Sequence, residues 1–333
     1  MRMIDCIGQE KIDGFSKLLG NARKVALAGH QHPDGDALGC VTALALYLQR
    51  ELGKEVVCMF PDALPQSLEF AMNPALRYLW GSVEDSDLII LADCNAFSRT
   101  GTLGDALASS PVPKVLIDHH LNPDADSFNL VFSTPEISSA SELTFWILKA
   151  MGWDRKDTEI GGALLTGMTT DTNNFANSVF PTTFTMASEL IAAGVDRDAI
   201  VRDIYFSYRE NRVRLMGYMQ HEGLRVLPEG ASYMVLTKDI QKRFDFMEGE
   251  SEGLVNVPLT IKGVRLSLLL KEDNDHFRVS LRSKKGTSAQ RCAMRFFNGG
   301  GHENAAGGKL FPEKDLGGES LEEYVKKALL ESL

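Results

Sequence analysis

The first half of the chain alternates short apolar runs with longer segments of helical spacing. Four apolar runs of five to seven residues have the length of buried strands: Lys24–Ala28, Glu55–Phe60, Asp87–Asp93 and Lys114–Asp118. Apolar positions three and four residues apart predict helices at Leu38–Leu52, Ser139–Met151, Thr158–Thr169 and Thr182–Ala193. This alternation predicts βαβ units and an α/β fold with a doubly wound, mainly parallel sheet.

The pattern changes in the second half. Residues 196–224 form an arginine-rich stretch of helical spacing, which we interpret as a connector. Beyond it we expect strands at Ser232–Thr237, Val264–Leu270 and Phe277–Ser283, and helices at Ala289–Phe297 and Glu319–Leu333. The chain is therefore predicted to have a first domain at 1–195, the connector at 196–224, and a smaller mixed α/β domain at 225–333.

The charge of the chain is acidic overall but uneven. A net charge of −10 argues against a protein that coats long nucleic acid, because such proteins neutralise many phosphates with Lys and Arg. Between His276 and Lys309, however, seven Lys or Arg residues accompany one acid, Glu303. This basic segment fits either a solvated surface strand or a site for a small phosphate-bearing substrate.

Cysteine usage and hydropathy narrow the class of protein further. Five scattered cysteines without a C-x-x-C pair argue against a disulfide framework or a thiolate zinc site and suggest small buried residues: Cys6, Cys40, Cys58, Cys94 and Cys292. No apolar run approaches the roughly 20 residues of a membrane helix, and the first 13 residues lack the apolar core of a signal peptide. We therefore predict a cytoplasmic protein without membrane association.

Ionisable residues gather where the predicted strands of the first half end. The segment His30-Gln-His-Pro-Asp34-Gly-Asp36 follows the first strand, and ligands of open α/β sheets bind beyond the carboxyl ends of the strands. Pro33 and Gly35 favour the tight turn that His30, Asp34 and Asp36 need in order to converge. The ordinary alternative is an Asp-Gly turn with a histidine nearby.

Three further segments contribute aspartate and histidine. Asp93 ends a buried apolar run, where an uncompensated carboxylate would be costly. In Asp118-His119-His120, one imidazole suits a metal, its neighbour suits the substrate, and Asp118 suits the orientation of a histidine. Asp171 follows a predicted apolar helix. Taken singly, each segment has a common alternative, either a capping aspartate or a pair of solvated histidines.

Taken together, these donors indicate a metal centre. A set of carboxylates with some imidazole suits Mn²⁺ or Mg²⁺ better than a thiolate-bound zinc. Two ions that share an aspartate, about 3.5–4 Å apart, are a common arrangement for phosphoryl chemistry. The combination therefore predicts metal-dependent phosphoester chemistry.

Along nearly its whole length the chain resembles the DHH–DHHA1 phosphoesterase family. Four segments are similar to the DHH motifs: His30-x-x-Pro-Asp34-Gly-Asp36, Asp93, Asp118-His119-His120 and Asp171-Thr. The segment Gly299-Gly-Gly-His302-x-x-Ala-Ala-Gly307 is similar to the signature of the DHHA1 domain. Within the family, the resemblance is to the nano-RNase and 3′-phosphoadenosine 5′-phosphate phosphatase group.

The resemblance implies a role for each motif residue. One Mn²⁺ (or Mg²⁺) would be held by His30, Asp34 and Asp93, and a second by Asp36, Asp93, His119 and Asp171, with Asp93 as the bridge. His120, supported by Asp118, would contact the scissile phosphate. The remote part of the substrate would be held by Arg282, Ser283, Gly300, Gly301 and His302. His32 departs from the family pattern and is expected to face solvent. The resemblance also suggests a homodimer.

The predicted function is hydrolysis of very short oligoribonucleotides to mononucleotides, with 3′-phosphoadenosine 5′-phosphate as a second candidate substrate. A cyclic- or linear-dinucleotide phosphodiesterase of the c-di-AMP type would use the same residues and stays an alternative. The Gly-Gly-Gly-His domain argues against an inorganic pyrophosphatase. The full donor set argues against a non-catalytic nucleotide-sensing module.

Overall fold

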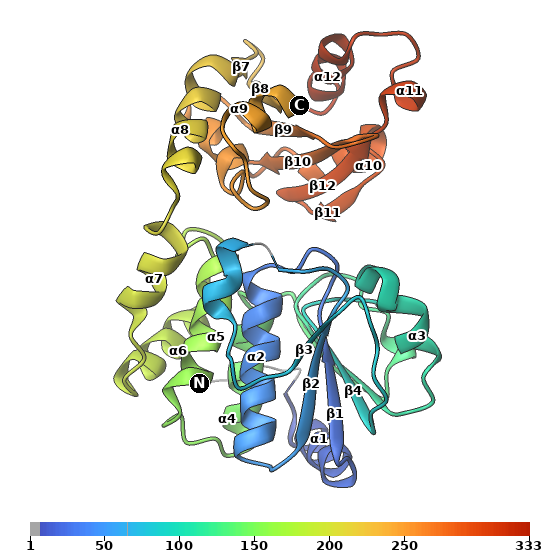
Figure 1. Cartoon of the computed structure of the whole chain (residues 1–333), viewed down its shortest axis with the longest axis vertical. Helices are drawn as coiled ribbons and strands as arrows, with labels where there is room; N and C mark the ends of the chain where they lie inside the picture. The colour runs from blue at the N-terminus through green and yellow to red at the C-terminus, as the bar shows by residue number, and fades with distance from the viewer. Residues whose placement is uncertain (1–6, 65) are drawn as a thin grey trace. The chain divides into compact units, whose positions relative to one another are not determined.

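The computed structural model describes residues 7–64 and 66–333, which fall into two compact units (Figure 1). Residues up to Ser207 belong to the first unit, and Tyr208–Leu333 form the second. The segment predicted as a connector is therefore divided between the units. It is not one helix, because α7 (Arg197–Tyr205) ends where Phe206 leaves helical geometry, with φ −127° and ψ 16°. Helix α8 (Glu210–Tyr218) and a π-helical turn (Met219–Gly223) follow.

The first unit contains a six-stranded parallel sheet, so the predicted α/β fold is confirmed. The strands lie in the order β3-β2-β1-β4-β5-β6. Their bounds are β1 Lys24–Ala28, β2 Glu55–Phe60, β3 Tyr78–Trp80, β4 Leu88–Ala92, β5 Lys114–Asp118 and β6 Leu130–Ser133. The helices are α1 Gln9–Asn21, α2 Gly35–Arg50, α3 Gly104–Ser109, α4 Ala140–Ala150, α5 Thr158–Asp171, α6 Pro181–Ala192 and α7, with 3-10 segments at Gln66–Ala71, Phe97–Leu103 and Ala125–Ser127.

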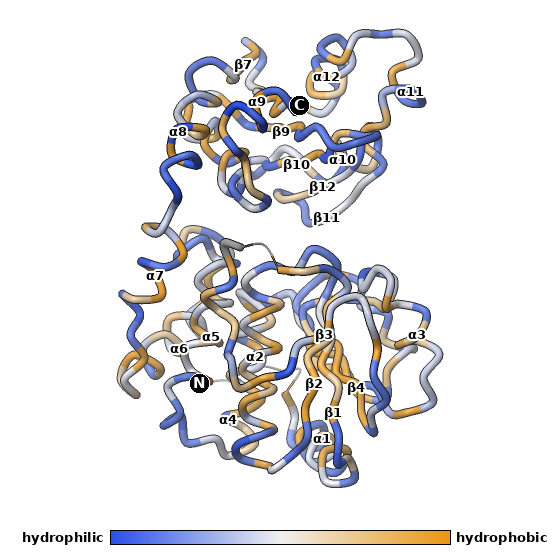
Figure 2. The backbone as a smooth tube through the Cα atoms, in the orientation of Figure 1, coloured by the Kyte–Doolittle hydropathy of each residue, from blue (hydrophilic) through white to orange (hydrophobic). Residues whose placement is uncertain are grey.

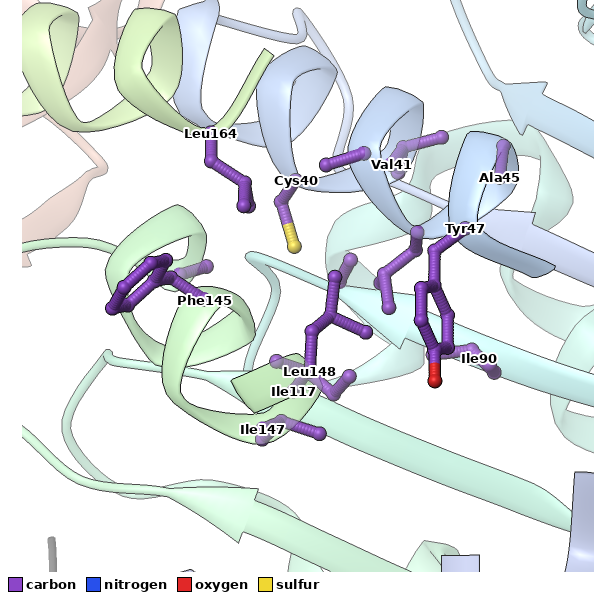
Figure 3. Close-up of a cluster of buried hydrophobic side chains, with 14 of the residues drawn as sticks. Cys40, Val41, Ala45, Tyr47, Ile90, Ile117, Phe145, Ile147, Leu148 and Leu164 are labelled. Carbon is purple, nitrogen blue, oxygen red and sulfur yellow. The ribbon is translucent and has the colours of Figure 1, made fainter. Parts of the chain in front are cut away.

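Helices cover both faces of this sheet, which explains why its strands are apolar throughout. In β1, Val25 and Leu27 pack into the cluster built by α1, α2 and α4, whereas Ala26 and Ala28 pack into the cluster on the α3 side. Figure 2 shows β1, β2 and β4 as apolar segments. Figure 3 shows part of the larger cluster, where Cys40 of α2 lies near Phe145 of α4. The described cysteines are buried and free, as predicted: Cys40, Cys58, Cys94 and Cys292; Cys6 lies outside the described residues.

Helices α2 and α5 approach closely because glycine lines their contact. A Cβ atom on Gly39 would lie 2.5 Å from the carbonyl oxygen of Ala163, and one on Gly167 would lie 2.8 Å from Asp36 Oδ1. A Cβ on Gly35 would meet the side chain of Thr170 at 2.4 Å. These contacts leave no room for a larger residue, so they fix the first turn of α2 against the last turn of α5.

The second unit contains a mixed sheet in the order β11-β12-β10-β9-β8-β7, as the prediction of a mixed α/β domain required. Strands β8 and β9 pair in parallel and the other neighbours are antiparallel. Helices α10 and α12 pack on one side of the sheet, and α8 packs on the other. The bounds are β7 Arg225–Val226, β8 Ala231–Leu236, α9 Lys238–Arg243, a 3-10 segment Leu254–Thr260, β9 Leu266–Glu272, β10 Phe277–Ser283, α10 Ala289–Phe296, β11 Gly300–His302, β12 Ala305–Leu310, α11 Pro312–Asp315 and α12 Leu321–Leu330.

Two further observations concern the segment near His302 and the lengths of the helices. Residues Gly300–His302 of the glycine-rich segment form strand β11, which pairs with β12. Among the described residues, no helix is both long enough and apolar enough to cross a bilayer.

Candidate metal centre

The candidate site lies at the point where the strand order of the first sheet reverses. Strand β1 pairs with β2 on one side and with β4 on the other, so the chain crosses over between β1 and β4. In open α/β sheets the crevice beyond the carboxyl ends at such a point is the usual place for ligands. His30 lies two residues beyond β1, and Asp93 lies directly beyond β4. The topology therefore brings these two residues together.

The first turn of α2 positions two of the aspartates. The predicted start at Leu38 is wrong, because α2 begins at Gly35 and Asp34 is its N-cap. Asp34 Oδ1 accepts hydrogen bonds from the backbone N–H groups of Asp36 and Ala37, at 3.0 and 3.1 Å. Such capping satisfies helix N–H groups that otherwise lack partners. It fixes Asp34 at the mouth of the site, where 59% of its side chain is exposed, and buries Asp36.

Asp93 lies between the two groups of donors. Its Oδ2 is 3.4 Å from His30 Nε2, and its Oδ1 is 3.4 Å from His119 Nε2. Asp93 has φ +54°, a left-handed conformation that is uncommon outside glycine and is a feature of functional sites. Burial raises the pKa of Asp93, but the imidazoles of His119 and His30 outweigh it and hold that pKa well below its usual range.

One buried oxygen of Asp93 lacks a hydrogen bond within the described structure. Asp93 Oδ1 is buried and receives no hydrogen bond within the described part of the chain. A buried carboxylate oxygen without a donor is costly and is rare in native structures. A bound cation would satisfy this oxygen.

The second group of donors comes from α2, α5 and the segment after β5. His119 Nε2 lies 3.9 Å from Asp36 Oδ2 and 3.6 Å from Asp171 Oδ2. Asp171 is the last residue of α5, not part of a turn beyond it, because the helix continues until Thr172 donates its N–H to the Met168 carbonyl. The structure thus places on rigid helices two carboxylates that the sequence pattern assigns to turns.

Crowding of acids perturbs this second group strongly. Burial and the nearby charges of Asp93 and Asp171 raise the pKa of Asp36 well above its usual range. Burial also raises the pKa of Asp171 to about 7. Burial lowers the pKa of His119, but its carboxylate neighbours, Asp93 first, raise it to about 10. The protein thus concentrates negative charge that protons only partly neutralise, as expected of a site built for cations.

The N-terminus of α4 holds Asp36 in place, a contact that sequence reasoning missed. Asp36 Oδ2 accepts a hydrogen bond from the Ala140 N–H at 2.6 Å, and Oδ1 accepts one from the Ser141 N–H at 2.9 Å. A helix N-terminus presents free N–H groups and a positive dipole end to the carboxylate. The capping serine Ser139 was a sequence signal for this N-terminus, but nothing in the sequence joins it to Asp36, more than one hundred residues away.

His120 and Asp118 form a separate pair. Asp118 Oδ1 lies 2.8 Å from His120 Nδ1, and Asp118 Oδ2 accepts the backbone N–H of His120 at 3.0 Å. The pairing fixes the imidazole and leaves Nε2 as its other polar atom. Its Nδ1 also lies 3.7 Å from Asp93 Oδ1, so His120 borders the same donor groups.

The donor atoms fit divalent cations. Three overlapping groups place one nitrogen or oxygen per residue within 4.8 Å of one another: His30, Asp34 and Asp93; Asp36, His119 and Asp171; and Asp93, His119 and His120. All sequence-predicted ligands therefore come together. His32 lies outside these groups; its side chain is 61% exposed and contacts Asp62, as its expected solvent-facing position implies.

The predicted substrate residues Arg282 and His302 lie on β10 and β11, the two strands that flank β12. The register pairs Ala305 with Arg282 on one side and with His302 on the other, so these residues form a row across the sheet. Gly299 and Gly301 permit this packing, since a Cβ on either would lie within 2.6 Å of a backbone oxygen of β12. Glycine at Gly300 and Gly301 leaves the β11 backbone accessible.

Ser283 makes hydrogen bonds within the second unit, and its predicted contact with substrate stays a prediction. It is buried, its hydroxyl donates to the Thr287 carbonyl at 2.6 Å, and the same oxygen accepts from Ala289 N–H and Asn304 Nδ2. With its hydrogen bonds satisfied, Ser283 ties β10 to the start of α10.

Comparison with known families agrees with the two-unit α/β fold. Residues 24–169 match the DHH family, N-terminal domain, and residues 231–328 match the DHHA1 domain. The chain belongs to the DHH family and carries a DHHA1 domain.

Relatives with the same two-domain span are known. The chain is 27% identical over 304 residues to the bifunctional oligoribonuclease and PAP phosphatase NrnA of Bacillus subtilis, covering 86% of this chain and 89% of the relative. It is 29% identical over 329 residues to the NrnA of Thermus thermophilus, covering 93% and 90%. Among solved structures, an exopolyphosphatase-related protein from Bacteroides fragilis is 37% identical, with a TM-score of 0.90, and the match covers 99% of this chain and 98% of that one.

Proposed function

We propose that this chain is a divalent-metal-dependent phosphoesterase that hydrolyses very short oligoribonucleotides to mononucleotides and removes the 3′-phosphate of 3′-phosphoadenosine 5′-phosphate. The names of the full-length NrnA relatives support this proposal. The observation that carries it is Asp93, a buried carboxylate whose two oxygens lie 3.4 Å from His30 Nε2 and 3.4 Å from His119 Nε2 and one of whose oxygens has no hydrogen-bond donor in the described structure. A bridging carboxylate of this kind suits a two-ion phosphoryl site.

We assign the ions as follows. His30, Asp34 and Asp93 would hold one, and Asp36, Asp93, His119 and Asp171 would hold the other. Two Mn²⁺ or Mg²⁺ ions bound there would supply an activated water and neutralise charge on the phosphate oxygens. The mixture of imidazole and carboxylate favours Mn²⁺ over Mg²⁺, because magnesium prefers an all-oxygen shell.

The remaining residues of the site orient and stabilise. The Asp118 carboxylate holds His120 through Nδ1–H, so that the protonated imidazolium can donate its Nε2–H to an oxygen of the scissile phosphate as negative charge develops there. The α4 N-terminus fixes Asp36, so one ligand is already in place before any ion binds. Preorganisation of this kind lowers the cost of assembling a site.

The second unit would select substrate length. Arg282 and His302 offer a guanidinium and an imidazole on the two strands that flank β12, and Arg binds phosphate with two parallel hydrogen bonds. A dinucleotide needs the metal centre at one phosphate and one such anchor for its remote part. The net charge of −10 gives long RNA little further attraction. A homodimer stays a prediction that sedimentation can check.

The test is a substrate panel assayed with Mn²⁺: dinucleotides, five- and twenty-nucleotide RNAs, cyclic dinucleotides, 3′-phosphoadenosine 5′-phosphate and pyrophosphate. We expect the linear dinucleotide to have the highest kcat/KM, with measurable release of phosphate from the bisphosphate. A preference for a cyclic dinucleotide would favour the phosphodiesterase alternative. Nucleotide binding without turnover of any substrate would identify a sensor and contradict the proposal.

A further inference from the structure

Arg99 lies beside the candidate metal centre with an exposed side chain. It belongs to the 3-10 segment Phe97–Leu103, which follows Asp93 closely in the chain. Its guanidinium forms no ion pair or hydrogen bond with any residue that the structure describes. An arginine in this state, on a segment that packs against the loop of His30 and Asp34, calls for an explanation, because a guanidinium readily pairs with an anionic group.

The backbone of Arg99 is fixed against the metal-binding loop. The carbonyl oxygen of Arg99 accepts the N–H of Gln31 at 2.8 Å, and Gln31 is the residue directly after His30. A Cβ atom on Gly101 would lie 3.2 Å from the Gln31 side chain, which shows how closely this segment packs on the loop. Arg99 is thus held one residue away from a proposed ligand of the first ion.

A second set of contacts ties the same segment to Cys94, the residue after Asp93. The Arg99 N–H donates to the carbonyl of Ala96 at 3.1 Å, and the thiol of Cys94 donates to that carbonyl at 3.2 Å. Phe97 is buried and stacks on Phe128, with ring centroids 4.8 Å apart. The root of the Arg99 side chain is therefore placed rigidly, while its charged end is free to meet a ligand.

Other arginines of the first unit show what is unusual here. Five of those described pair with a carboxylate: Arg50, Arg77, Arg155, Arg197 and Arg202. Arg23, like Arg99, forms no ion pair with the described residues, but it precedes β1, at the amino edge of the sheet. Arg99 lies at the carboxyl edge, where ligands of such sheets bind. Solvent therefore explains the unpaired guanidinium of Arg23 at the amino edge, whereas a bound ligand can explain that of Arg99 at the carboxyl edge.

We propose that Arg99 is a substrate-binding residue of the first unit, which holds an oxygen of the phosphate group presented to the metal centre. A planar guanidinium with several donors suits a phosphate, and its permanent charge balances an anion that enters an acidic site. Arg99 would thus attract and orient the phosphate at a position independent of Arg282 and His302. This inference rests on the proposed phosphoesterase function.

The experiment compares Arg99→Gln and Arg99→Lys with the matched control Arg23→Gln, which removes the same charge at the opposite edge of the sheet. Two quantities are measured on the Mn²⁺-loaded full chain: kcat/KM for a dinucleotide, and the Kd of a nucleoside 5′-monophosphate. Metal content and melting temperature are recorded for each variant.

We expect Arg99→Gln to lower kcat/KM by about 10- to 100-fold and to weaken mononucleotide binding, as for a charged hydrogen bond removed. Arg99→Lys should recover part of the loss, Arg23→Gln should lie within about twofold of the native chain, and all should keep their metal. Equal effects of Arg99→Gln and Arg23→Gln, or loss of metal in Arg99→Gln, would overturn the inference. If the native chain hydrolyses nothing, the proposed function fails, and the mononucleotide Kd still decides the role of Arg99.

Discussion

Two clusters of charged side chains, one in each unit, differ in how their charges balance. In the second unit, Glu248 pairs with Lys271 at 2.6 Å and with Arg278 at 2.9 Å, and Arg278 also pairs with Asp273 at 2.9 Å. Two acids meet two bases, and the pairing outweighs burial and lowers the pKa of both Glu248 and Asp273. Every charge named in this cluster therefore has an opposite charge beside it.

The charges in the cluster of the first unit do not balance. Its carboxylates outnumber its histidines, the pKa of Asp36 is raised by like charge, and a buried oxygen of Asp93 lacks a donor in the described structure. The cluster of the second unit is therefore typical of an ion network that stabilises a fold, whereas the cluster of the first unit is typical of a binding site for a cation. It also shows that Arg278, part of the basic segment seen in the sequence, is neutralised and is not available to the substrate.

The largest expected effect comes from Asp93→Ala, compared with Glu248→Ala. Loss of the shared carboxylate should remove both ions and lower kcat by on the order of 10³-fold or more, because several kcal/mol of charge stabilisation disappear. Glu248→Ala removes the same charge from the self-paired cluster and should keep metal and turnover. Elemental analysis and dinucleotide hydrolysis measure both. Wild-type metal occupancy in Asp93→Ala would show that Asp93 is not the bridge.

A smaller loss is expected from His120→Ala, which should retain both ions but lower kcat by roughly 10²–10³-fold, the usual effect of losing one donor to a developing charge. Asp118→Asn keeps the shape of the orienting group and should lose less. Metal content and kcat of both variants are the measurements. If His120→Ala loses an ion, the roles of His119 and His120 are exchanged.

In the second unit, Arg282→Ala and His302→Ala should each lower kcat/KM for a dinucleotide by a factor of roughly 5 to 150. This factor corresponds to a loss of about 1–3 kcal/mol of transition-state stabilisation. A simple ester such as bis-p-nitrophenyl phosphate needs no remote anchor and should be affected little. Arg278→Ala is the matched control, because its guanidinium is already paired. Equal losses on both substrates would show that the second unit is not the anchor, and equal cleavage of a twenty-mer would refute the preference for short RNA.

The smallest effect is a proton count. In the metal-free protein the pKa of His119 is about 10, so its imidazole is protonated at neutral pH and must lose that proton to bind an ion. Mn²⁺ binding should therefore release protons at pH 7, and affinity should rise with pH as protons compete less. Calorimetric titration in two buffers of different ionisation enthalpy gives the number released. A value of zero would contradict this arrangement of His119.

The apolar pattern predicted β1, β2, β4 and β5, and it located the candidate donors beside these strands, because both are local signals; it missed β3 and β6. The runs Lys24–Ala28 and Lys114–Asp118 match β1 and β5 residue for residue, and each donor follows from its place near an apolar run. The contact of Asp36 with the N-terminus of α4 was missed because it joins segments over one hundred residues apart. Gly39 and Gly167 gave no local signal either, since their role is a helix contact.

The helix boundaries failed for a related reason. Helix α2 starts earlier than its apolar spacing indicates, because the Asp34 side chain caps it, and polar capping lies outside an apolar pattern. In the second unit, the glycines before His302 have no apolar pattern that would predict a strand. Gly300–His302 form strand β11 because they pair with β12, where the close approach of the two strands leaves no room for a Cβ on Gly301.

The most direct test of the central claim is dinucleotide hydrolysis by exhaustively chelated protein, followed by stepwise return of Mn²⁺ with bound metal measured at each step. We predict no turnover after chelation, and recovery that reaches its plateau at two ions per chain, with Mg²⁺ restoring less. Full activity in the chelated protein would contradict the account.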